Sequence, residues 1–388
     1  MEDRMTNSRK AGEPRIAIAS VGLGRIQRGY ERHTRNLFEA LRGSCNVELF
    51  KSAGSESDNE KIPAFLGPLT SVCRLLPFEP IAGVPEYRRY KNDCCAFSLT
   101  LLPYLLRNEF DIVHVVDYFL ATILVRLRQM TRFPARLIFT DGGLMPPQYY
   151  PRADHIHFVA EDHFRNALAF GMPANHLSLI PCGFHSRRFP AEVDRSALRQ
   201  KYGISNDTFV ILSVSALNRH HKRVQHIIDE VSRMSGDFFL WLDGRAEDSS
   251  LAGMAREKLG DRCRITHVPS EEVAELYGVA DVFVHAATEE AFGLAICEAA
   301  ASGTMVLVHD SPHFQWLIGD RDCLIDMKMT GALAEKLRRL ASHRAHERKP
   351  SLAASIRNRF DWDIVAPRYI EMYRNVAGMM PLAGGSAM

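Results

Sequence analysis

Residues 282–303, VFVHAATEEAFGLAICEAAASG, join a short run of β-branched and aromatic residues to a helical pattern rich in small residues. The run VFVHAA has the composition of a buried strand. Gly293 stands just before the helical pattern, where a glycine lets the backbone approach a ligand closely. The exposed N–H groups of a first helical turn form an anion site. The stretch therefore predicts a strand, a loop and a helix whose N-terminus faces an anionic ligand.

Two glutamates, Glu290 and Glu298, bracket the apolar run AFGLAIC. One explanation is a capped, buried helix, because acidic side chains near a helix N-terminus are stabilised by the helix dipole. Eight residues of helix would set the two side chains about 80° apart, so a shared helical face does not explain the pair. A nucleotide-sugar that spans loop and helix explains it better. Its diphosphate would lie over the helix N-terminus, and its hydroxyls would donate to the carboxylates, which only accept when ionised.

The same alternation of strand and helix patterns runs along most of the chain and is typical of parallel sheets built from β-α-β units. We predict strands at 15–22, 111–116, 135–140, 155–160 and 177–182 in a first half, and at 209–217, 238–244, 264–269, 282–287 and 305–310 in a second. A chain of 388 residues is more often two domains than one.

The predicted organisation has five parts. They are a disordered tail over 1–14, a Rossmann-like acceptor domain over 15–184, a linker with a short helix over 185–207, a Rossmann-like nucleotide-sugar domain over 208–358, and a C-terminal helix over 359–376. Open parallel sheets bind ligands at the carboxyl ends of their strands, so we expect a ligand crevice between the two domains.

Composition and charge narrow the class of protein. The chain is 46% hydrophobic and 24% charged, which is ordinary for a soluble globular protein. Its formal net charge of +2 argues against a bulk electrostatic nucleic-acid binder. The eight cysteines form no C-x-x-C pair, and the first residues contain no apolar signal region. These features favour a cytoplasmic protein, with peripheral attachment at the inner membrane face left open.

Four arginines, Arg25, Arg28, Arg32 and Arg35, are spaced so that a helix would place them on one face. Such a stripe could contact a diphosphate, an anionic acceptor or acidic lipid headgroups. A solvated helix face is an equally good explanation of the spacing.

Five stretches of the chain share their order and composition with one known family. They are RGYERHTRNLFEAL (28–41), PCGFHSRRF (181–189), VPSEEVAELYGVADVFVHAA (268–287), EAFGLAICE (290–298) and FDW (360–362) with Tyr369 and Tyr373. The fourth resembles the E-x7-E motif of the retaining glycosyltransferases of family four. The resemblance covers roughly residues 15–375. It implies the GT-B fold, in which two Rossmann-like domains face each other across a cleft and a C-terminal helix returns to the first domain.

The resemblance also implies roles for individual residues. In that family the first glutamate of the motif contacts the donor sugar and the second contacts the ribose, which places these roles on Glu290, a catalytic candidate, and on Glu298. Backbone groups around Phe292, Gly293 and Leu294 would then meet the sugar and the phosphates. Two further donor contacts are implied, at Gly29, where the first helix would approach the diphosphate, and at Val268, whose backbone would contact the base.

The chain departs from the family at the phosphate clamp. The family uses an arginine and a lysine after the first strand of the second domain. Lys222 matches the lysine, but Ala216 stands where the arginine is expected. We take Arg219 in the same loop as the candidate substitute and Arg223 as the second choice, with a solvated basic loop as the alternative.

A second departure lies in the first domain, where many relatives have a histidine that faces the transferred sugar. Here the stretch LIFTDGGLMPP (137–147) has Thr140 and Asp141. Asp141 is a tentative second catalytic residue, and a turn-forming Asp-Gly pair is nearly as good an explanation. Retention in this family is thought to use the leaving phosphate to deprotonate the acceptor, so no dedicated base is required.

No metal or other cofactor is expected. The D-x-D pairs Asp320/Asp322 and Asp361/Asp363 lie at predicted turns or helix starts, where aspartate favours local hydrogen bonds. His155 and His157 share a strand face but have no third ligand at a recognisable spacing. The glycines of VGLGRIQRG miss the G-x-G-x-x-G spacing of a dinucleotide site.

The sequence therefore predicts a retaining, metal-independent glycosyltransferase that moves a sugar from a nucleoside-diphosphate donor to an acceptor. The alternatives are a nucleotide-sugar epimerase or glycosyl phosphorylase on the same scaffold, or a catalytically inactive subunit that binds sugar nucleotides. The base, the sugar, the acceptor and the oligomeric state are left open, because acceptor loops contain no readable code.

Overall fold

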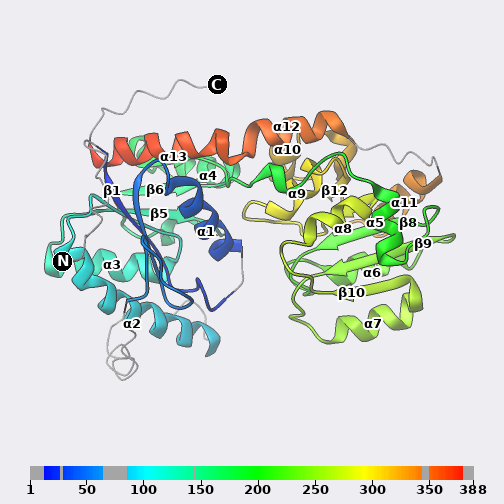
Figure 1. Ribbon diagram of the computed structural model, residues 1–388, viewed down its shortest axis with the longest axis horizontal. Helices are drawn as coiled ribbons and strands as arrows, with labels where there is room; N and C mark the ends of the chain where they lie inside the picture. The colour runs from blue at the N-terminus through cyan, green and yellow to red at the C-terminus, as the bar shows by residue number, and fades with distance from the viewer. Residues whose placement is uncertain (1–12, 27–28, 64–84, 144, 343–348, 379–388) are drawn as a thin grey trace, which may run out of the picture. The chain divides into compact units, whose positions relative to one another are not determined.

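The computed structural model describes residues 13–26, 29–63, 85–143, 145–342 and 349–378. The chain divides into two compact units, and each is described by itself. Unit 1 comprises Met1–Gly183 and Val365–Met388, and unit 2 comprises Phe184–Ile364. Each unit is a parallel sheet with helices on both faces (Figure 1), which confirms two Rossmann-like α/β domains.

The sheet of unit 1 has seven strands in the order β3-β2-β1-β4-β5-β6-β7. The strands are β1 (Arg15–Ser20), β2 (Asn46–Lys51), β3 (Glu60–Lys61), β4 (Ile112–Val115), β5 (Arg136–Asp141), β6 (His155–Phe158) and β7 (Leu177–Leu179). All neighbouring strands run parallel. The strand order reverses between β1 and β4, which is the switch point typical of a Rossmann-like sheet.

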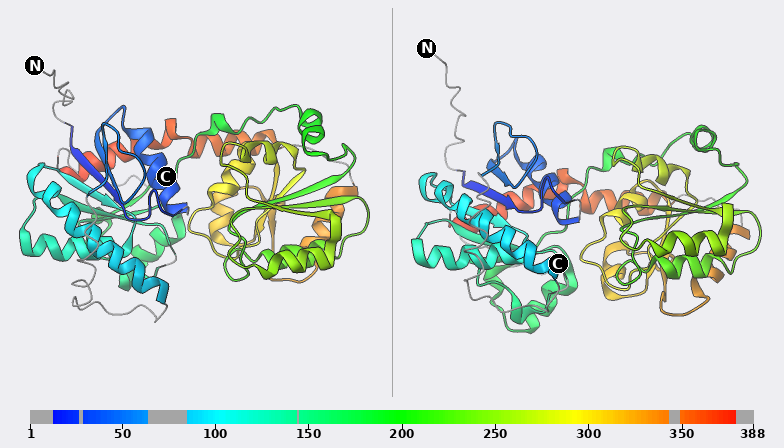
Figure 2. Two further views of the ribbon diagram at one scale, coloured as in Figure 1. Left: turned by 60° about the horizontal axis from the view of Figure 1, so that its bottom comes forward. Right: turned by 90° about the horizontal axis from the view of Figure 1, so that it is seen from below.

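Two helix layers cover this sheet (Figures 1 and 2). The helices of unit 1 are α1 (Gly29–Leu41), α2 (Pro85–Arg107), α3 (Tyr118–Thr131), α4 (Glu161–Ala169) and most of α13 (Trp362–Ala377), with short 3₁₀ turns η2 (Pro147–Tyr149) and η3 (Ala174–His176). Apolar residues of α2 and α3 form one core cluster with Val113, Val115 and Phe139 of the sheet. His114 and Thr140 alternate with those residues and therefore point to the opposite face.

A buried polar network on that opposite face holds α13 to unit 1. His114 Nδ1 lies 2.7 Å from the Tyr373 hydroxyl, and its Nε2 lies 2.6 Å from Thr140 Oγ1. Thr140 Oγ1 is also 2.8 Å from His157 Nδ1, while His157 Nε2 donates to the Ile180 carbonyl at 2.8 Å. The C-terminal helix thus belongs to the first unit, as the sequence predicted.

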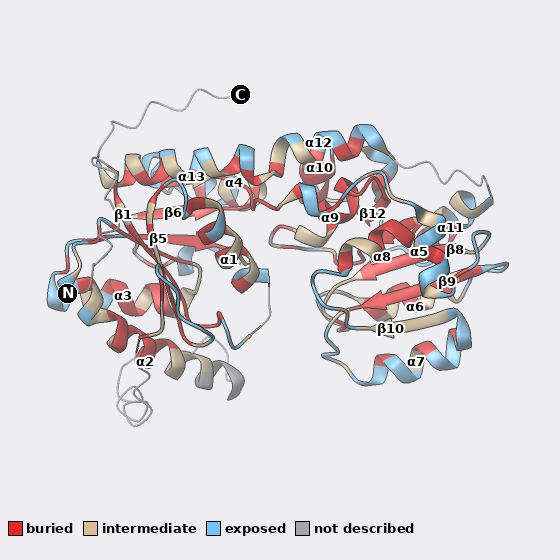
Figure 3. Ribbon diagram, in the orientation of Figure 1, coloured by how far each residue is buried: buried red, intermediate tan, exposed pale blue. Residues whose placement is uncertain are grey.

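The sheet of unit 2 has six parallel strands in the order β10-β9-β8-β11-β12-β13. The strands are β8 (Phe209–Val214), β9 (Phe238–Asp243), β10 (Cys263–Thr266), β11 (Val282–Val284), β12 (Met305–His309) and β13 (Leu324–Ile325). Counted within the unit this is the order 3-2-1-4-5-6, with its switch point between β8 and β11. The inner strands are mostly buried, whereas the edge strand β10 is only partly buried (Figure 3).

Helices again form two groups by their contacts. They are α5 (Arg195–Tyr202), α6 (Val224–Val231), α7 (Ser250–Leu259), α8 (Val273–Val279), α9 (Leu294–Ala301), α10 (Pro312–Ile318), α11 (Ala332–Ser342) and α12 (Pro350–Phe360), with 3₁₀ turns η4 (Ser186–Arg188), η5 (Gly260–Arg262) and η6 (Arg321–Cys323). Helix α6 packs against α7 and α11, whereas α8 packs against α5 and α9, and α9 packs against α12.

All ten predicted strands are present, most of them shorter than predicted. Three further strands, β2, β3 and β13, were not predicted. Strand β2, NVELFK, has charged residues at Glu48 and Lys51 that interrupt its apolar run, and β3 and β13 have two residues each, too few to show a periodic pattern.

The predicted linker over 185–207 requires correction, because the structure makes it part of unit 2. Helix α5 lies within it, starts at the Asp194 cap and ends at Gly203 in the left-handed conformation. The Arg199 side chain is buried and donates to Asp281 at 2.7 Å. A buried charge is retained only when it is paired in this way, so α5 is fixed to the domain that follows it.

The predicted C-terminal helix over 359–376 is in fact the end of α12 and, after a break at Asp361, α13. The Asp361 carboxylate accepts from the backbone N–H of Ser186 at 3.0 Å and of Asp363 at 2.8 Å. Asp320 similarly accepts from the N–H of Asp322 at 3.0 Å. Both D-x-D pairs thus serve as local caps, as predicted.

Two observations concern the cysteines and the helices. The seven cysteines within the described ranges are free thiols, and all but Cys263 are buried. Within those same ranges, no helix is both long enough and apolar enough to cross a bilayer. The residues 1–12 of the predicted tail lie outside the described part of the chain.

Candidate functional site

Polar side chains gather at the switch point of unit 2, beyond the carboxyl ends of β8 and β11. Lys222 lies in the loop that follows β8, and His285 and Glu290 follow β11. The loop then enters α9 at Gly293. Open parallel sheets bind ligands at this position, because adjacent loops diverge there and leave helix N-termini exposed.

Glu290 is the centre of this cluster. Its side chain is only 10% exposed, and Lys222 Nζ forms an ion pair with its Oε2 atom. His285 Nε2 lies 3.0 Å from the same oxygen. The other oxygen, Oε1, has no partner among the residues that the structure describes. The carboxylate is therefore held from one side and presents one free acceptor.

The surroundings keep Glu290 ionised. Burial opposes ionisation, but the hydrogen bond from His285 and the charge of Lys222 together hold the pKa of the Glu290 carboxyl well below its ordinary value. Burial lowers the pKa of His285 as well, so its ring is neutral at neutral pH and donates through Nε2–H. At physiological pH the cluster contains one carboxylate, one ammonium and one neutral imidazole.

The loop after β8 is folded so that Lys222 reaches this carboxylate. The Asn218 side chain accepts from the backbone N–H of His221 at 3.0 Å and of Lys222 at 2.8 Å. Arg223 has a left-handed backbone, with φ of 51°, and donates to the carbonyls of Ala286 at 3.3 Å and Met327 at 2.9 Å. Arg223 thus ties this loop to the one after β11, and its guanidinium has a structural role.

Arg219, the predicted substitute for the missing arginine, is bound elsewhere. Its Nε donates to Asp248 at 2.8 Å and its NH2 donates to Ser250 Oγ at 2.9 Å, next to the start of α7. The side chain is 38% exposed. The structure therefore joins Lys222 to the glutamate but gives Arg219 a different partner.

The start of α9 has the conformation expected of an anion site. Gly293 caps the helix with φ of 103°, and a Cβ at this position would lie 2.8 Å from Ile296 Cδ1. Gly293 and Leu294 are partly exposed. Phe292 is buried against Trp316 and Phe360, and its carbonyl accepts from His313 at 3.0 Å. The backbone N–H of Ile296 donates to the Gly293 carbonyl at 3.0 Å. The N–H groups that precede it have no carbonyl one turn earlier in the helix, so they can bind a ligand.

Glu298 lies one turn into α9 and is 1% exposed. Its Oε2 accepts from the Tyr277 hydroxyl at 3.1 Å. Glu298 is therefore more enclosed than Glu290.

Val268 follows β10, as predicted. Its backbone N–H donates to Asp243 Oδ1 at 2.9 Å. The N–H is thus occupied, and any backbone contact of Val268 with a base would use its carbonyl.

In unit 1, Asp141 has a structural environment. The side chain is buried at the end of β5 and accepts from the Tyr150 hydroxyl at 3.0 Å and from His163 Nδ1 at 2.8 Å. It also accepts from the N–H of Gly143 at 3.3 Å, as a turn-forming Asp-Gly pair does. The geometry favours the turn over the tentative catalytic role. His155 and His157 are buried in β6, and no metal-ligand cluster is found within the described ranges.

The predicted arginine stripe is not a helical face. Helix α1 begins at Gly29, so Arg25 lies outside it, and Arg28 is not among the described residues. Arg25 pairs with Asp93 at 3.2 Å and Arg35 pairs with Glu60 at 2.8 Å. Gly29 itself is exposed, and a Cβ there would meet no described heavy atom within 4 Å.

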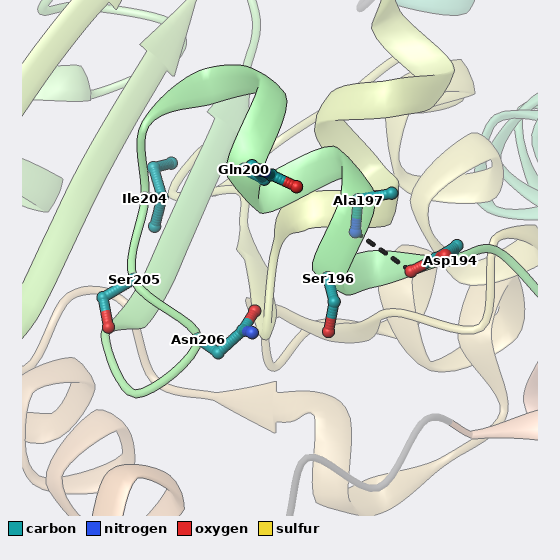
Figure 4. A pocket seen from close by; sticks show the side chains of 7 residues that line it. All are labelled: Asp194, Ser196, Ala197, Gln200, Ile204, Ser205 and Asn206. Carbon is teal, nitrogen blue, oxygen red and sulfur yellow. Dashed lines mark hydrogen bonds between the residues drawn. The ribbon is translucent and has the colours of Figure 1, made fainter.

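Figure 4 shows a surface hollow of unit 2. It is lined by Asp194, Gln200, Asn206 and their neighbours in the segment that precedes β8. This segment meets the amino ends of the strands, and Asp194 there caps α5 through the N–H of Ala197 at 3.0 Å. The hollow is thus on the wrong edge of the sheet for the ligand site described above.

Two members of the cluster, His285 and Asn218, were not predicted from the sequence. The signal for His285 was its position in VFVHAA at the carboxyl end of a predicted strand. Asn218 gave no signal, because its role lies in the fold of its loop.

Known proteins resemble both halves of the chain. Residues 27–188 match the family model described as Glycosyltransferase Family 4, and residues 194–357 match the one described as Glycosyl transferases group 1. The chain belongs to glycosyltransferase family four. The two matched segments of this family four chain fall on the two units that the structure defines.

Curated relatives align with part of the chain. A D-inositol 3-phosphate glycosyltransferase of Streptomyces bingchenggensis is 26% identical over 221 residues, which is 53% of this chain and 49% of the relative. A GDP-mannose:cellobiosyl-diphosphopolyprenol alpha-mannosyltransferase of Xanthomonas oryzae pv. oryzae is 28% identical over 131 residues, which is 32% of this chain and 34% of the relative. The alignments thus span between a third and a half of these relatives.

Solved structures resemble nearly the whole length of the chain. Sucrose-phosphate synthase from Thermosynechococcus elongatus has a TM-score of 0.79 at 19% identity and covers 95% of this chain and 100% of its own. The Anabaena protein HepE, solved with UDP-glucose, has a TM-score of 0.71 at 16% identity and covers 93% and 99%. At these identities the likeness concerns the fold, which is GT-B.

Proposed function

We propose that this family four chain is a retaining glycosyltransferase that takes a sugar from a nucleoside-diphosphate donor bound in unit 2. The observation behind the proposal is the cluster at the switch point, where Lys222 and His285 hold Glu290 beside the N-terminus of α9. Such a site combines an acceptor for sugar hydroxyls with donors for phosphate oxygens.

Each residue has a role in this proposal. Glu290 accepts from a hydroxyl of the transferred sugar through Oε1, and Glu298 accepts from the ribose. The N–H groups of Gly293 and Leu294 stabilise the diphosphate, whose negative charge grows as the glycosidic bond breaks. Lys222 contributes a positive charge to the same region while it holds Glu290.

The proposal needs no metal, because fixed cations and helix dipoles stabilise a leaving phosphate as a metal would. Both D-x-D pairs bind backbone N–H groups of their own turns. Transfer activity is therefore expected to persist in EDTA. Strict dependence on a divalent cation would contradict this part of the proposal.

Two relatives guide the choice of donors to test. One is named for GDP-mannose and another was solved with UDP-glucose. We suggest a thermal-shift screen of uridine, guanosine and adenosine diphosphate sugars, followed by NMR of the anomeric proton of any transfer product. Retention of the donor's anomeric configuration supports the proposal, and binding without turnover would instead indicate an inactive subunit.

Glu298→Ala tests the ribose contact. Removing one hydrogen bond to a charged group costs about tenfold or more in affinity, so calorimetry should show weaker donor binding. Glu289→Ala is the matched control, because Glu289 is exposed in the same loop. Unchanged donor affinity in a folded Glu298→Ala variant would remove Glu298 from the site.

A further inference from the structure

We propose that His285 is a positioning residue that aims the Glu290 carboxylate at the sugar of the donor. The inference rests on the proposed function, since it assigns to His285 a purpose only if Glu290 contacts a sugar. It adds a specificity device that the E-x7-E pattern does not contain.

The His285 ring is packed against two phenylalanine rings. It is 3% exposed and lies over Phe283, with the ring centroids 6.5 Å apart and the planes at 11°. Phe314 of α10 meets it edge-on, with centroids 6.3 Å apart. Phe283 and His285 are two residues apart along an extended segment and so share one face of the sheet. The direction of the Nε2–H bond is therefore set by the packed core of unit 2.

The fixed direction of the His285 Nε2–H bond determines how the Glu290 carboxylate is oriented. His285 and Lys222 both bind Oε2 of Glu290, and they approach it from different loops. A lysine ammonium is a point charge on a flexible stem, whereas an imidazole donates along one fixed line. Lys222 thus supplies charge and His285 supplies orientation. With Oε2 occupied, rotation of the carboxylate would break both contacts, so Oε1 stays turned to the ligand side.

Leaving one oxygen of the buried Glu290 carboxylate without a hydrogen bond costs free energy unless a ligand supplies a donor. A buried carboxylate that could accept several hydrogen bonds keeps one oxygen unused by the described residues. The Asp141 carboxylate of unit 1 differs, because both of its oxygens accept hydrogen bonds, from Tyr150, from His163 and from the N–H of Gly143. The unused acceptor of Glu290 therefore fits a hydroxyl donor from outside the protein.

Two substitutions separate orientation from packing. His285→Phe removes the donor and keeps an aromatic ring between Phe283 and Phe314. His285→Gln keeps an N–H donor at a similar reach. The control is His309→Phe, which alters a buried histidine at the end of the adjacent strand β12 that binds the N–H of Met327 at 3.2 Å.

The measurement is calorimetric binding of UDP-glucose beside UDP, and of GDP-mannose beside GDP. For the pair that the unaltered chain binds, His285→Phe should weaken the sugar nucleotide about tenfold and leave the nucleoside diphosphate unchanged. His285→Gln should restore most of the loss, and His309→Phe should not change the ratio of the two affinities. The double variant His285→Phe with Glu290→Gln should lose no more affinity for the sugar nucleotide than Glu290→Gln alone, because His285 acts through Glu290.

Three results would overturn the positioning role. They are equal weakening of sugar nucleotide and nucleoside diphosphate, no weakening of either, and additive losses in the double variant. These results leave the proposed function intact, since the unaltered chain still binds its donor. If the unaltered chain binds neither pair and no other nucleotide sugar in the screen, the proposed function fails, and the role of His285 fails with it.

Discussion

In unit 1 the buried polar groups beneath α13 bind one another, whereas in unit 2 the polar groups beyond β8 and β11 leave one carboxylate oxygen without a described partner. Both sheets have the same Rossmann-like strand order around their switch points. The network of His114, Thr140 and His157 is closed and neutral, and its bonds fix a helix. The cluster of Lys222, His285 and Glu290 is charged and open on one side.

The comparison separates two uses of a buried polar group. A group whose hydrogen bonds all end inside the protein adds specificity to the fold. A group that is held in place but keeps an acceptor free is arranged for a ligand. Four predictions test this difference, from the largest expected effect to the smallest.

Acid should destabilise unit 1 through its buried histidines. Burial lowers the pKa of His33 and His155 to about 4 and that of His114 to about 3. Their ordinary pKa is about 6.5, so the folded chain binds fewer protons than the unfolded chain. The stabilisation is complete above pH 6.5 and is lost as the pH falls from there toward 4. Each histidine contributes up to about 1.4 kcal/mol per pH unit to the slope.

Denaturant unfolding between pH 6.5 and 5 measures this slope, since carboxylates in the unfolded chain are still largely ionised there. His114→Gln keeps hydrogen-bonding groups but removes one titrating ring, so it should reduce the slope. A slope that is flat in the unaltered chain would mean that these rings are not held neutral.

Glu290→Gln should impair transfer while leaving the fold nearly unchanged. The amide keeps the size of the side chain but loses the charge that pairs with Lys222 and the hydroxyl. Transfer is expected to fall about 100-fold, because hydrogen bonds to a charged acceptor are the strong ones. Steady-state kinetics with the identified donor measure this effect. The matched control, Glu289→Gln in the same loop, should retain full activity.

Asp141→Asn should lower stability and leave transfer unchanged, which is the opposite of the effect expected for Glu290→Gln. It replaces a buried acceptor that binds Tyr150 and His163, so the free energy of unfolding should fall by about 1–3 kcal/mol. The transfer rate per folded molecule should stay the same. A large kinetic loss without loss of stability would restore Asp141 as a catalytic residue and erase the difference between the two units.

Arg219→Met should have the smallest effect, at most about twofold in donor affinity. Its guanidinium binds Asp248 and Ser250, and such exposed pairs contribute little. Lys222→Met should weaken donor binding by at least tenfold, since it removes the charge beside Glu290. Equal losses in the two variants would identify Arg219 as the substitute for the arginine that Ala216 replaces.

The sequence by itself determined the architecture and the central carboxylate. Runs such as VFVHAA and FVILSV are short, rich in β-branched and aromatic residues and bounded by helical patterns, and this combination indicates buried strands. The spacing of Glu290, Gly293 and Glu298 marked a strand, loop and helix that meet at a ligand edge. Lys222 was recognised because it matches the lysine that the resembling family has in the loop after a predicted strand.

Only the tertiary structure decided which side chains act together. Lys222 and Glu290 are 68 residues apart, and Arg219 lies three residues from Lys222 yet binds Asp248. The same holds for 185–207, which is polar and turn-rich but becomes part of unit 2 once Arg199 reaches Asp281 across 82 residues. Periodicity describes the local backbone, whereas pairing depends on where loops from separate strands meet. The partners of His285, Asp141 and Arg219 could therefore not be predicted from the sequence alone.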